Sequence, residues 1–225
     1  MWADVVLIAG AYLFGSLPHL SLLGKLRGIN VEGDLHIDLW RRGGRLVGTI
    51  GILGEFAKGI IPVLVGKSLD FPLLVIVIAG VAVVSGQMWP IFSKFDGEKG
   101  NSVGLAMAGT LVPMALFIAL VPIAIGAGIR TLPRLLDTSQ SLNKRLMFGG
   151  PPSLSLPLGM AAGFLVLPIA SWWLGEPLVV TLGFSVLFVL IMVRRLTAGL
   201  RDDLKADADI KSVLANRFLY DRSYR

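Results

Sequence analysis

The sequence predicts an all-α integral membrane protein, built as a bundle of about seven transmembrane helices. Of its 225 residues, 54% are hydrophobic and only 16% are charged, whereas a soluble domain of this size needs more polar surface to cover its core. Runs such as 1–24 and 71–91 carry almost no charge, and about 20 apolar residues cross a bilayer as one helix. Basic residues gather between such runs, which is typical of cytoplasmic loops.

The apolar stretches follow one another at 3–24, 46–66, 71–91, 102–128, 153–174 and 177–193. The first is a poor signal peptide, because Asp4 is its only charge and no basic segment precedes the apolar run. We assign 1–195 to the transmembrane bundle and 196–225 to a charged cytoplasmic tail. Apolar residues spaced along the tail from Leu196 to Phe218 suggest a loosely amphipathic helix.

The number of crossings follows from the basic residues. The 25–45 loop and the tail are both basic and should both face the cytoplasm, but six crossings would place them on opposite sides. As one helix, 102–128 would be about 40 Å long, more than a bilayer core requires, and Pro113 and Pro122 interrupt it. We therefore expect two short helices there, the fourth and fifth, turning near 110–113, which gives seven crossings.

This topology places the N-terminus outside an inner (plasma) membrane, with the basic loops, the 130–150 segment and the tail in the cytoplasm. The tryptophans support it, since Trp2 and Trp172–Trp173 then fall at the outer interface and Trp89 at the inner one.

The composition argues against several kinds of site. Cysteine is absent, which removes disulfides, thiolate metal sites and cysteine nucleophiles. His19 and His36 alone cannot build a metal cluster, so the sequence predicts neither a metal nor a cofactor. The net charge of +6 fits basic loops facing anionic lipid headgroups better than a nucleic-acid partner, and no protein partner is indicated.

Polar residues at the predicted cytoplasmic helix ends are the candidates for chemistry. Ser16 could bond to its own helical turn or to a carbonyl freed by Pro18, and a purely structural role and a chemical role are equally good interpretations of it. The arginines and the glycine pair of 41–45 could bind a phosphate, although a positive-inside anchor for the next helix is the favoured interpretation. Lys99, flanked by glycines in a loop, could meet phosphate oxygens as a mobile charge, but the loop lacks the spacing of a Walker A motif.

Glu55 and Lys58 lie three residues apart, which places both on one helix face at membrane depth. Ionisable groups there are costly and usually pair or face a wet cavity. A structural ion pair and a role in orienting a site are equally consistent with this spacing.

Four motifs occur in order: Ala11-Tyr12-Leu13-Phe14-Gly15-Ser16, Arg41-x-Gly43-Gly44-Arg45, Glu55-x-x-Lys58-Gly59-x-x-Pro62-Val63 and Gly86-Gln87-x-Trp89-Pro90-x-Phe92-x-Lys94-Phe95-x-Gly97-x-Lys99-Gly100. Together they resemble the motifs of the bacterial membrane acyl-phosphate:glycerol-3-phosphate acyltransferases. The resemblance covers roughly residues 8–128, and the remainder matches by hydropathy only. It implies a seven-helix bundle with short fourth and fifth helices. It also implies acyl transfer from acyl-phosphate to glycerol 3-phosphate in phospholipid biosynthesis, among membrane lipids.

The resemblance also implies roles for individual residues. The implied catalytic positions are Ser16, Gln87 and Lys99. The implied phosphate-binding positions are Arg41, Gly43, Gly44, Arg45, Lys58, Gly97, Gly100 and Asn101.

The chain departs from the family pattern at several positions. The family's glycine-serine-asparagine loop is replaced by the shorter, acidic stretch 30–38. The family's histidine in the last motif is Gln87, which cannot shuttle a proton near neutral pH. The other altered positions are Asp38, Asp96, Glu98, Arg194, Arg195 and Thr197. These departures keep open a second hypothesis, a non-catalytic relative that binds lipid or a partner. A small transporter is a weaker third hypothesis, because no inverted repeat is apparent.

Overall fold

The computed structural model describes residues 1–29, 35–141, 145, 154–205 and 209–221, and these residues form helices joined by turns and loops. The chain divides into two compact units, Met1–Pro113 and Met114–Arg225. Each unit is described by itself below.

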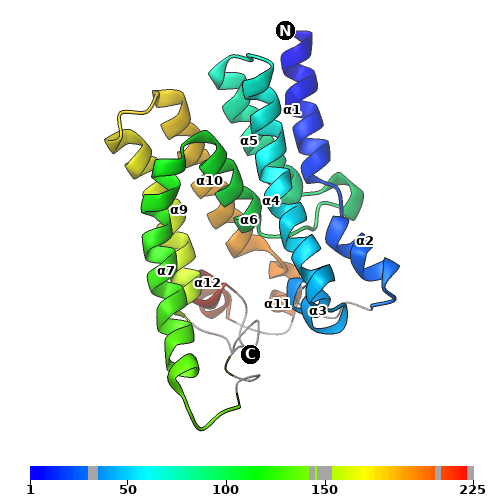
Figure 1. Ribbon diagram of the computed structural model, residues 1–225, viewed down its shortest axis with the longest axis vertical. Coiled ribbons are helices and arrows are strands. Elements are labelled where there is room, and N and C mark those ends of the chain that lie inside the picture. Colours follow the sequence, from blue (N-terminus) through cyan, green and yellow to red (C-terminus); the bar gives the residue numbers. More distant parts are fainter. Residues whose placement is uncertain (30–34, 142–144, 146–153, 206–208, 222–225) are drawn as a thin grey trace. The chain divides into compact units, whose positions relative to one another are not determined.

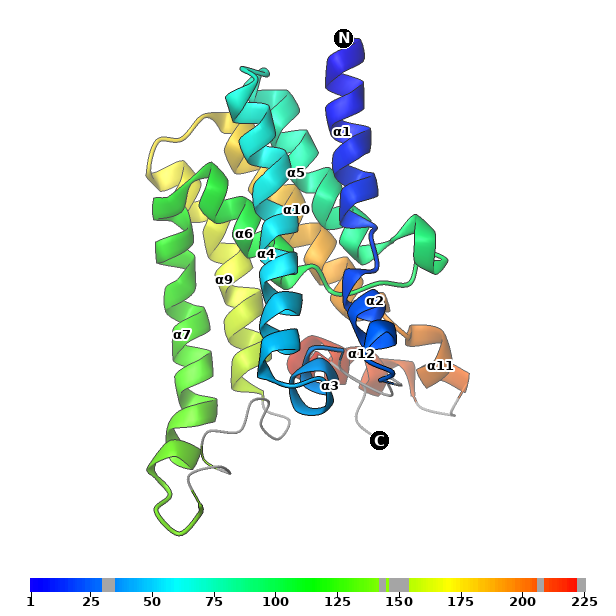
Figure 2. The ribbon, with the colours of Figure 1, turned by 45° about the vertical axis from the view of Figure 1, so that its right-hand side comes forward.

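The described residues of the first unit form six α-helices and a single 3₁₀ turn at Ile91–Ser93. The α-helices are α1 (Trp2–Gly15), α2 (His19–Leu26), α3 (Leu35–Arg42), α4 (Arg45–Ser68), α5 (Leu73–Met88) and α6 (Asn101–Leu111). α1, α4 and α5 pack side by side (Figures 1 and 2), and α6 packs against α4 and α5. The unit's most buried side chains include Val63, Val83, Val103 and Met107, which come from α4, α5 and α6.

Glycines allow α1 and α5 to approach closely. A Cβ atom at Gly15 would lie 2.1 Å from the carbonyl oxygen of Val83, and one at Gly86 would lie 2.1 Å from that of Tyr12. No side chain fits at such distances, so the backbones of the two helices touch at both points, as small residues permit in membrane helices. This contact fixes the end of α1 against the end of α5.

The first apolar stretch, expected as one helix over 3–24, is broken. α1 ends at Gly15, and α2 starts at His19 after the bend at Ser16–Pro18. Pro18 lacks an amide hydrogen and its ring disfavours a continuous helix. α2 then packs on α3 and α4, where Leu20, Leu39 and Val47 form a small buried cluster.

The 102–128 stretch breaks where the sequence predicted, since α6 ends at Leu111 and α7 (Pro113–Leu136) starts two residues later. α6 is short, as expected, with 11 residues. The expectation of a short fifth helix is wrong, because α7 has 24 residues and continues through Pro122 and Pro133. Its exposed apolar residues recur every fourth position, at 117, 121, 125 and 129, and continue at Leu132 and Leu136.

The second unit holds most of α7 together with α9 (Ser155–Trp173), α10 (Leu178–Thr197), α11 (Leu200–Lys205) and α12 (Ile210–Tyr220). Gly126 of α7 and Gly159 of α9 lie against each other's helix, each with a backbone carbonyl within 2.7 Å of its Cβ position. The described part of the tail forms two short helices, α11 and α12, where one amphipathic helix was expected. α12 packs on α9 and α10. Whether the tail faces the cytoplasm stays a prediction.

Six helical segments of the described chain are long and apolar enough to cross a bilayer: Trp2–Leu26, Arg45–Ser68, Leu73–Ser93, Pro113–Leu136, Ser155–Trp173 and Leu178–Thr197. α6, with 11 residues, reaches only about 16 Å and cannot span alone. A seventh crossing would therefore require α6 to be sheltered by its neighbours, and the crossing number stays a prediction.

Candidate active site

Lys58 lies at the centre of a buried hydrogen-bond network in the first unit. Its Nζ atom donates to the carbonyl oxygens of Gly15 (2.9 Å) and Leu17 (2.5 Å) and to Oε1 of Gln87 (2.7 Å). The last carbonyls of a helix need partners outside the helix, and Lys58 supplies one where α1 ends. An ammonium group has three N–H bonds, so these contacts use all of them.

Gln87, at the end of α5, connects Lys58 to Glu55. Its Nε2 atom donates to Oε1 of Glu55 at 3.0 Å, while its Oε1 atom accepts from Lys58. Glu55 and Lys58 lie on one face of α4, as the spacing predicted, and each is only 3% exposed. Because the two charges are joined through Gln87, they orient this amide, which favours the site-orienting reading over a simple ion pair.

A pocket of about 250 Å³ opens beside this network. Its wall comes from the α1–α2 bend, the end of α5 and the loop before α6, and it includes Ser16, His19, Gln87, Asp96, Gly97 and Glu98. A Cβ atom at Gly97 would lie 2.3 Å from the carbonyl oxygen of Gln87, so glycine is required for the loop to close over α5. Of the described residues, those lining the pocket carry two carboxylates and no lysine or arginine.

Ser16 bonds back to its own helical turn, with Oγ donating to the carbonyl oxygen of Tyr12 at 2.9 Å. Ser16 is 1% exposed, yet it forms part of the pocket wall. The Tyr12 hydroxyl donates to the carbonyl oxygen of Trp89 at 2.7 Å, which ties α1 to the end of α5. His19 contacts the carbonyl oxygen of Gly51 through Nε2 at 3.1 Å, so α2 is held to α4 on the other side of the pocket.

The predicted site residues therefore fall into three groups. Ser16, Gln87 and Gly97 line the pocket. Lys58 lies behind the lining and donates a hydrogen bond to Gln87. The second group consists of Lys99, Gly100 and Asn101, which directly follow the pocket loop at the start of α6. Gly100 is the N-cap of α6 and has φ +74°. The third group lies at the α3–α4 junction, where both arginines are exposed, and it consists of Arg41, Gly43, Gly44 and Arg45. The roles assigned to these residues stay predictions.

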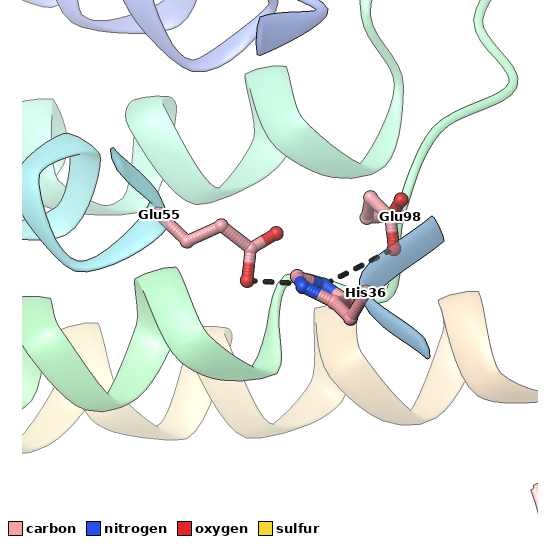
Figure 3. Close-up of side chains that lie close together, drawn as sticks. All are labelled: His36, Glu55 and Glu98. Atoms are coloured by element: carbon pink, nitrogen blue, oxygen red, sulfur yellow. Dashed lines mark ion pairs between the residues drawn. The ribbon is translucent and has the colours of Figure 1, made fainter. Parts of the chain in front are cut away.

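A cluster that the sequence analysis missed lies next to Gln87. Nε2 of His36, on α3, is 3.3 Å from Oε2 of Glu55 and 4.0 Å from Oε2 of Glu98 (Figure 3). The prediction of no metal cluster rested on the two histidines alone and did not consider carboxylate ligands. No spacing in the sequence relates His36 to the two glutamates, since three separate segments bring them together.

Three of the positions that depart from the family's motif pattern lie in the second unit, namely Arg194, Arg195 and Thr197. Arg195 is 5% exposed and donates to the carbonyl oxygens of Pro157 (2.7 Å) and Arg217 (3.2 Å). These contacts hold α12 to α9 and α10, so Arg195 has a structural role there.

Comparisons with known proteins agree with these features. The family model described as glycerol-3-phosphate acyltransferase matches residues 5–201. A glycerol-3-phosphate acyltransferase of Geotalea daltonii is 34% identical over 125 residues, which are 53% of this chain and 64% of the relative. Another, of Trichlorobacter lovleyi, is 39% identical over 125 residues, with coverages of 53% and 64%. The chain thus matches less than two thirds of the length of these relatives.

Two crystal structures of PlsY (YgiH), described as an integral membrane glycerol 3-phosphate acyltransferase, share the fold. The lysophosphatidic acid form aligns with a TM-score of 0.68 at 22% identity, covering 95% of this chain and 99% of that one. The glycerol 3-phosphate form aligns with a TM-score of 0.66 at 22% identity, covering 90% of each chain. The predicted fold class, an all-α multi-pass integral membrane bundle, is therefore confirmed. Because the family model matches most of the sequence, the chain belongs to the glycerol-3-phosphate acyltransferase family.

Proposed function

We propose that this protein transfers an acyl group from an acyl-phosphate to glycerol 3-phosphate in phospholipid synthesis, forming lysophosphatidic acid and inorganic phosphate. Membership of the family supports this activity. The observation that carries it is the pocket beside Lys58, whose wall contains Ser16, Gln87 and Gly97. These residues come from distant parts of the chain and were each predicted as site residues.

The reaction needs positioning more than a strong nucleophile. The acceptor hydroxyl oxygen attacks the acyl carbon, the bond from that carbon to the phosphate oxygen breaks, and the hydroxyl proton passes to the departing phosphate. Donors that hold both phosphates fix the two reactants together and offset charge on the leaving group. We assign contacts with the reactants to Ser16 and Gln87, and phosphate contacts to Lys99 and Arg41. Gly43, Gly44, Arg45, Gly97, Gly100 and Asn101 complete the proposed phosphate-binding set.

Lys58 takes a different role from the one first expected. Its three N–H bonds are already used by Gly15, Leu17 and Gln87, so it has no donor left for a phosphate. We assign it to positioning, because it fixes both the end of α1 and the amide of Gln87.

An apolar groove between α1 and α4 is suited to the acyl chain. It has a volume of about 250 Å³ and is lined by Val6, Leu7, Gly10, Ala11, Phe14, Ile61, Pro62 and Val65. Its α1 residues end one position before Gly15 and two before Ser16, which line the polar pocket. A chain lying along α1 would thus bring its activated end to the pocket.

We place the protein in the inner (plasma) membrane, with the N-terminus outside and the pocket loop, the 130–150 segment and the tail in the cytoplasm. The positive-inside rule supports this orientation. Soluble glycerol 3-phosphate would reach the pocket from the cytoplasm, and the acyl chain would reach the groove from the membrane.

A second candidate is a non-catalytic relative that binds lipid or a protein partner. The observation in its favour is the pair of carboxylates at the pocket wall, Asp96 and Glu98, which repel anionic substrates.

An activity assay decides between the two candidates. It combines the purified full-length protein with acyl-phosphate and glycerol 3-phosphate. An acyltransferase produces lysophosphatidic acid, detected by mass spectrometry, together with inorganic phosphate, at a rate that depends on both substrates. No product, in parallel with an active relative under the same conditions, would reject acyl transfer between these substrates and favour the non-catalytic candidate.

A further inference from the structure

The side chains of His36, Glu55 and Glu98 converge on one point. They come from α3, from α4 and from the loop before α6, and one donor atom of each lies within 4.8 Å of the other two. We infer that these three residues bind one divalent transition-metal ion, of the Zn²⁺ or Mn²⁺ class, at the edge of the polar pocket. The site is independent of the proposed function, whereas its role in substrate binding rests on that function.

The geometry favours a metal over a proton relay. A relay through imidazole uses the two ring nitrogens for two different partners, but here both carboxylates approach Nε2, at 3.3 Å and 4.0 Å. At 4.0 Å the contact between His36 and Glu98 is too long for a hydrogen bond. Three donor atoms that converge from three separate segments are the arrangement expected of metal ligands.

The distances fit a metal with little adjustment. Zinc binds imidazole nitrogen and carboxylate oxygen at about 2.0–2.2 Å, so ligand atoms around it lie roughly 3.5 Å apart. Nε2 of His36 and Oε2 of Glu55 are 3.3 Å apart, which is already close to this separation. The carboxylate of Glu98 must move inward slightly, and its side chain is 31% exposed in a loop, so it has room to do so.

The contacts around Glu55 resemble the outer shell of a metal site. One carboxylate oxygen faces His36, while the other accepts the hydrogen bond from Gln87 at 3.0 Å. Hydrogen bonds of this kind orient a ligating carboxylate and are a regular feature of metal sites. One imidazole and two carboxylates leave further coordination positions open, as catalytic sites require.

The charge of the pocket gives a reason for a cation. Asp96 and Glu98 line it, and the described lining contains no lysine or arginine, although the proposed substrates carry phosphates. A divalent ion held by His36, Glu55 and Glu98 would neutralise the two ligand carboxylates and offer a phosphate oxygen an open position. The acidic pocket loop and the anionic substrates would then be compatible.

Metal binding by the full-length protein in detergent tests this site without any substrate. After treatment with a chelator and its removal, ZnCl₂ is titrated calorimetrically and MnCl₂ is followed by electron paramagnetic resonance. We expect one ion per chain at micromolar affinity. His36→Ala and Glu98→Gln should each weaken binding at least about tenfold.

The chain offers a matched control for each variant. His19→Ala removes the other histidine, and Asp96→Asn removes the other pocket carboxylate, but neither residue belongs to the cluster. Both controls should keep the wild-type affinity. The inference is overturned if the wild type binds neither ion below millimolar concentration, or if His36→Ala and His19→Ala bind equally well. Binding without acyl transfer would support the site and reject only the proposed function.

Discussion

Oε1 of Gln87 accepts a hydrogen bond of 2.7 Å from Nζ of Lys58, and both side chains are buried. The same amide donates from Nε2 to Glu55, so one neutral side chain serves a buried cation and a buried anion at once. A side-chain amide offers a donor and an acceptor side by side in this way. The network therefore fixes the end of α5 and the bend after α1 relative to α4.

Replacing Lys58 with Met should be strongly destabilising. The variant leaves the carbonyl oxygen of Gly15, Oε1 of Gln87 and the carboxylate of Glu55 without their cation, and breaking a buried charged network costs about 3–5 kcal/mol. Thermal unfolding in detergent measures the effect.

Lys67 provides the matched control on the same helix. It also donates to backbone carbonyls, those of Thr110 (2.6 Å) and Leu111 (3.4 Å), but it is exposed. Lys67→Met should cost only about 1 kcal/mol. Equal losses in the two variants would show that burial of the Lys58 network is unimportant.

Two glycines of α1 should differ in their tolerance of a methyl group. Gly15→Ala should shift α1 away from α5 and lower the unfolding temperature and the yield of folded protein, because its Cβ would lie 2.1 Å from the Val83 carbonyl oxygen. Gly10→Ala should change neither quantity, since nothing lies within 4 Å of its Cβ position. A destabilised Gly10→Ala variant would contradict this packing of α1.

Hydropathy and proline positions predicted much of the fold. The apolar stretches correspond to the long helices, and Pro113 begins a new helix as expected. The length of α7 was missed because the segment from residue 130 was assigned to the cytoplasm, whereas the helix continues to Leu136. The helix tolerates this polar stretch, and the Thr131 hydroxyl bonds to the carbonyl oxygen of Ala127 at 2.7 Å within it.

The site was only partly predictable. Ser16, Gln87 and Gly97 were identified by motif, and the structure brings them to one pocket. The roles of His36 and Glu98 could not be inferred, because α3 is a short polar helix whose position beside Glu55 depends on packing between distant segments. Lys58 was identified as a site residue. Its hydrogen bonds to two backbone carbonyls and to the Gln87 amide could not be predicted, because they depend on how the helices pack.

Replacing Lys99 with Ala should abolish acyl transfer while leaving the protein folded. Removing one donor that stabilises developing charge typically lowers kcat by about 10²- to 10³-fold. The rate of lysophosphatidic acid formation measures the loss. Lys94→Ala, an exposed lysine of the same loop, should keep most of the activity. Full activity in Lys99→Ala would remove this lysine from the site.

Gly10→Phe should shorten the acyl chain that the enzyme prefers. The Cβ position of Gly10 is open, and the residue lines the apolar groove, so an aromatic ring can fill the groove without disturbing α1. We expect kcat/KM to fall for long acyl-phosphates and to change little for short ones. A uniform change across chain lengths would place the acyl chain elsewhere.

The side of the membrane on which the 130–150 segment lies decides the number of crossings. Because the chain has no cysteine, Ser68→Cys and Ser139→Cys each introduce a single thiol at an exposed position. With seven crossings, a membrane-impermeant maleimide added to intact cells should label position 68 and reach position 139 only after lysis. Six crossings, with α6 not spanning, would place both thiols outside, and intact cells would label both. The comparison thus tests whether α6 and α7 together turn the chain back across the membrane, which places the segment after α7 on the side of the pocket loop.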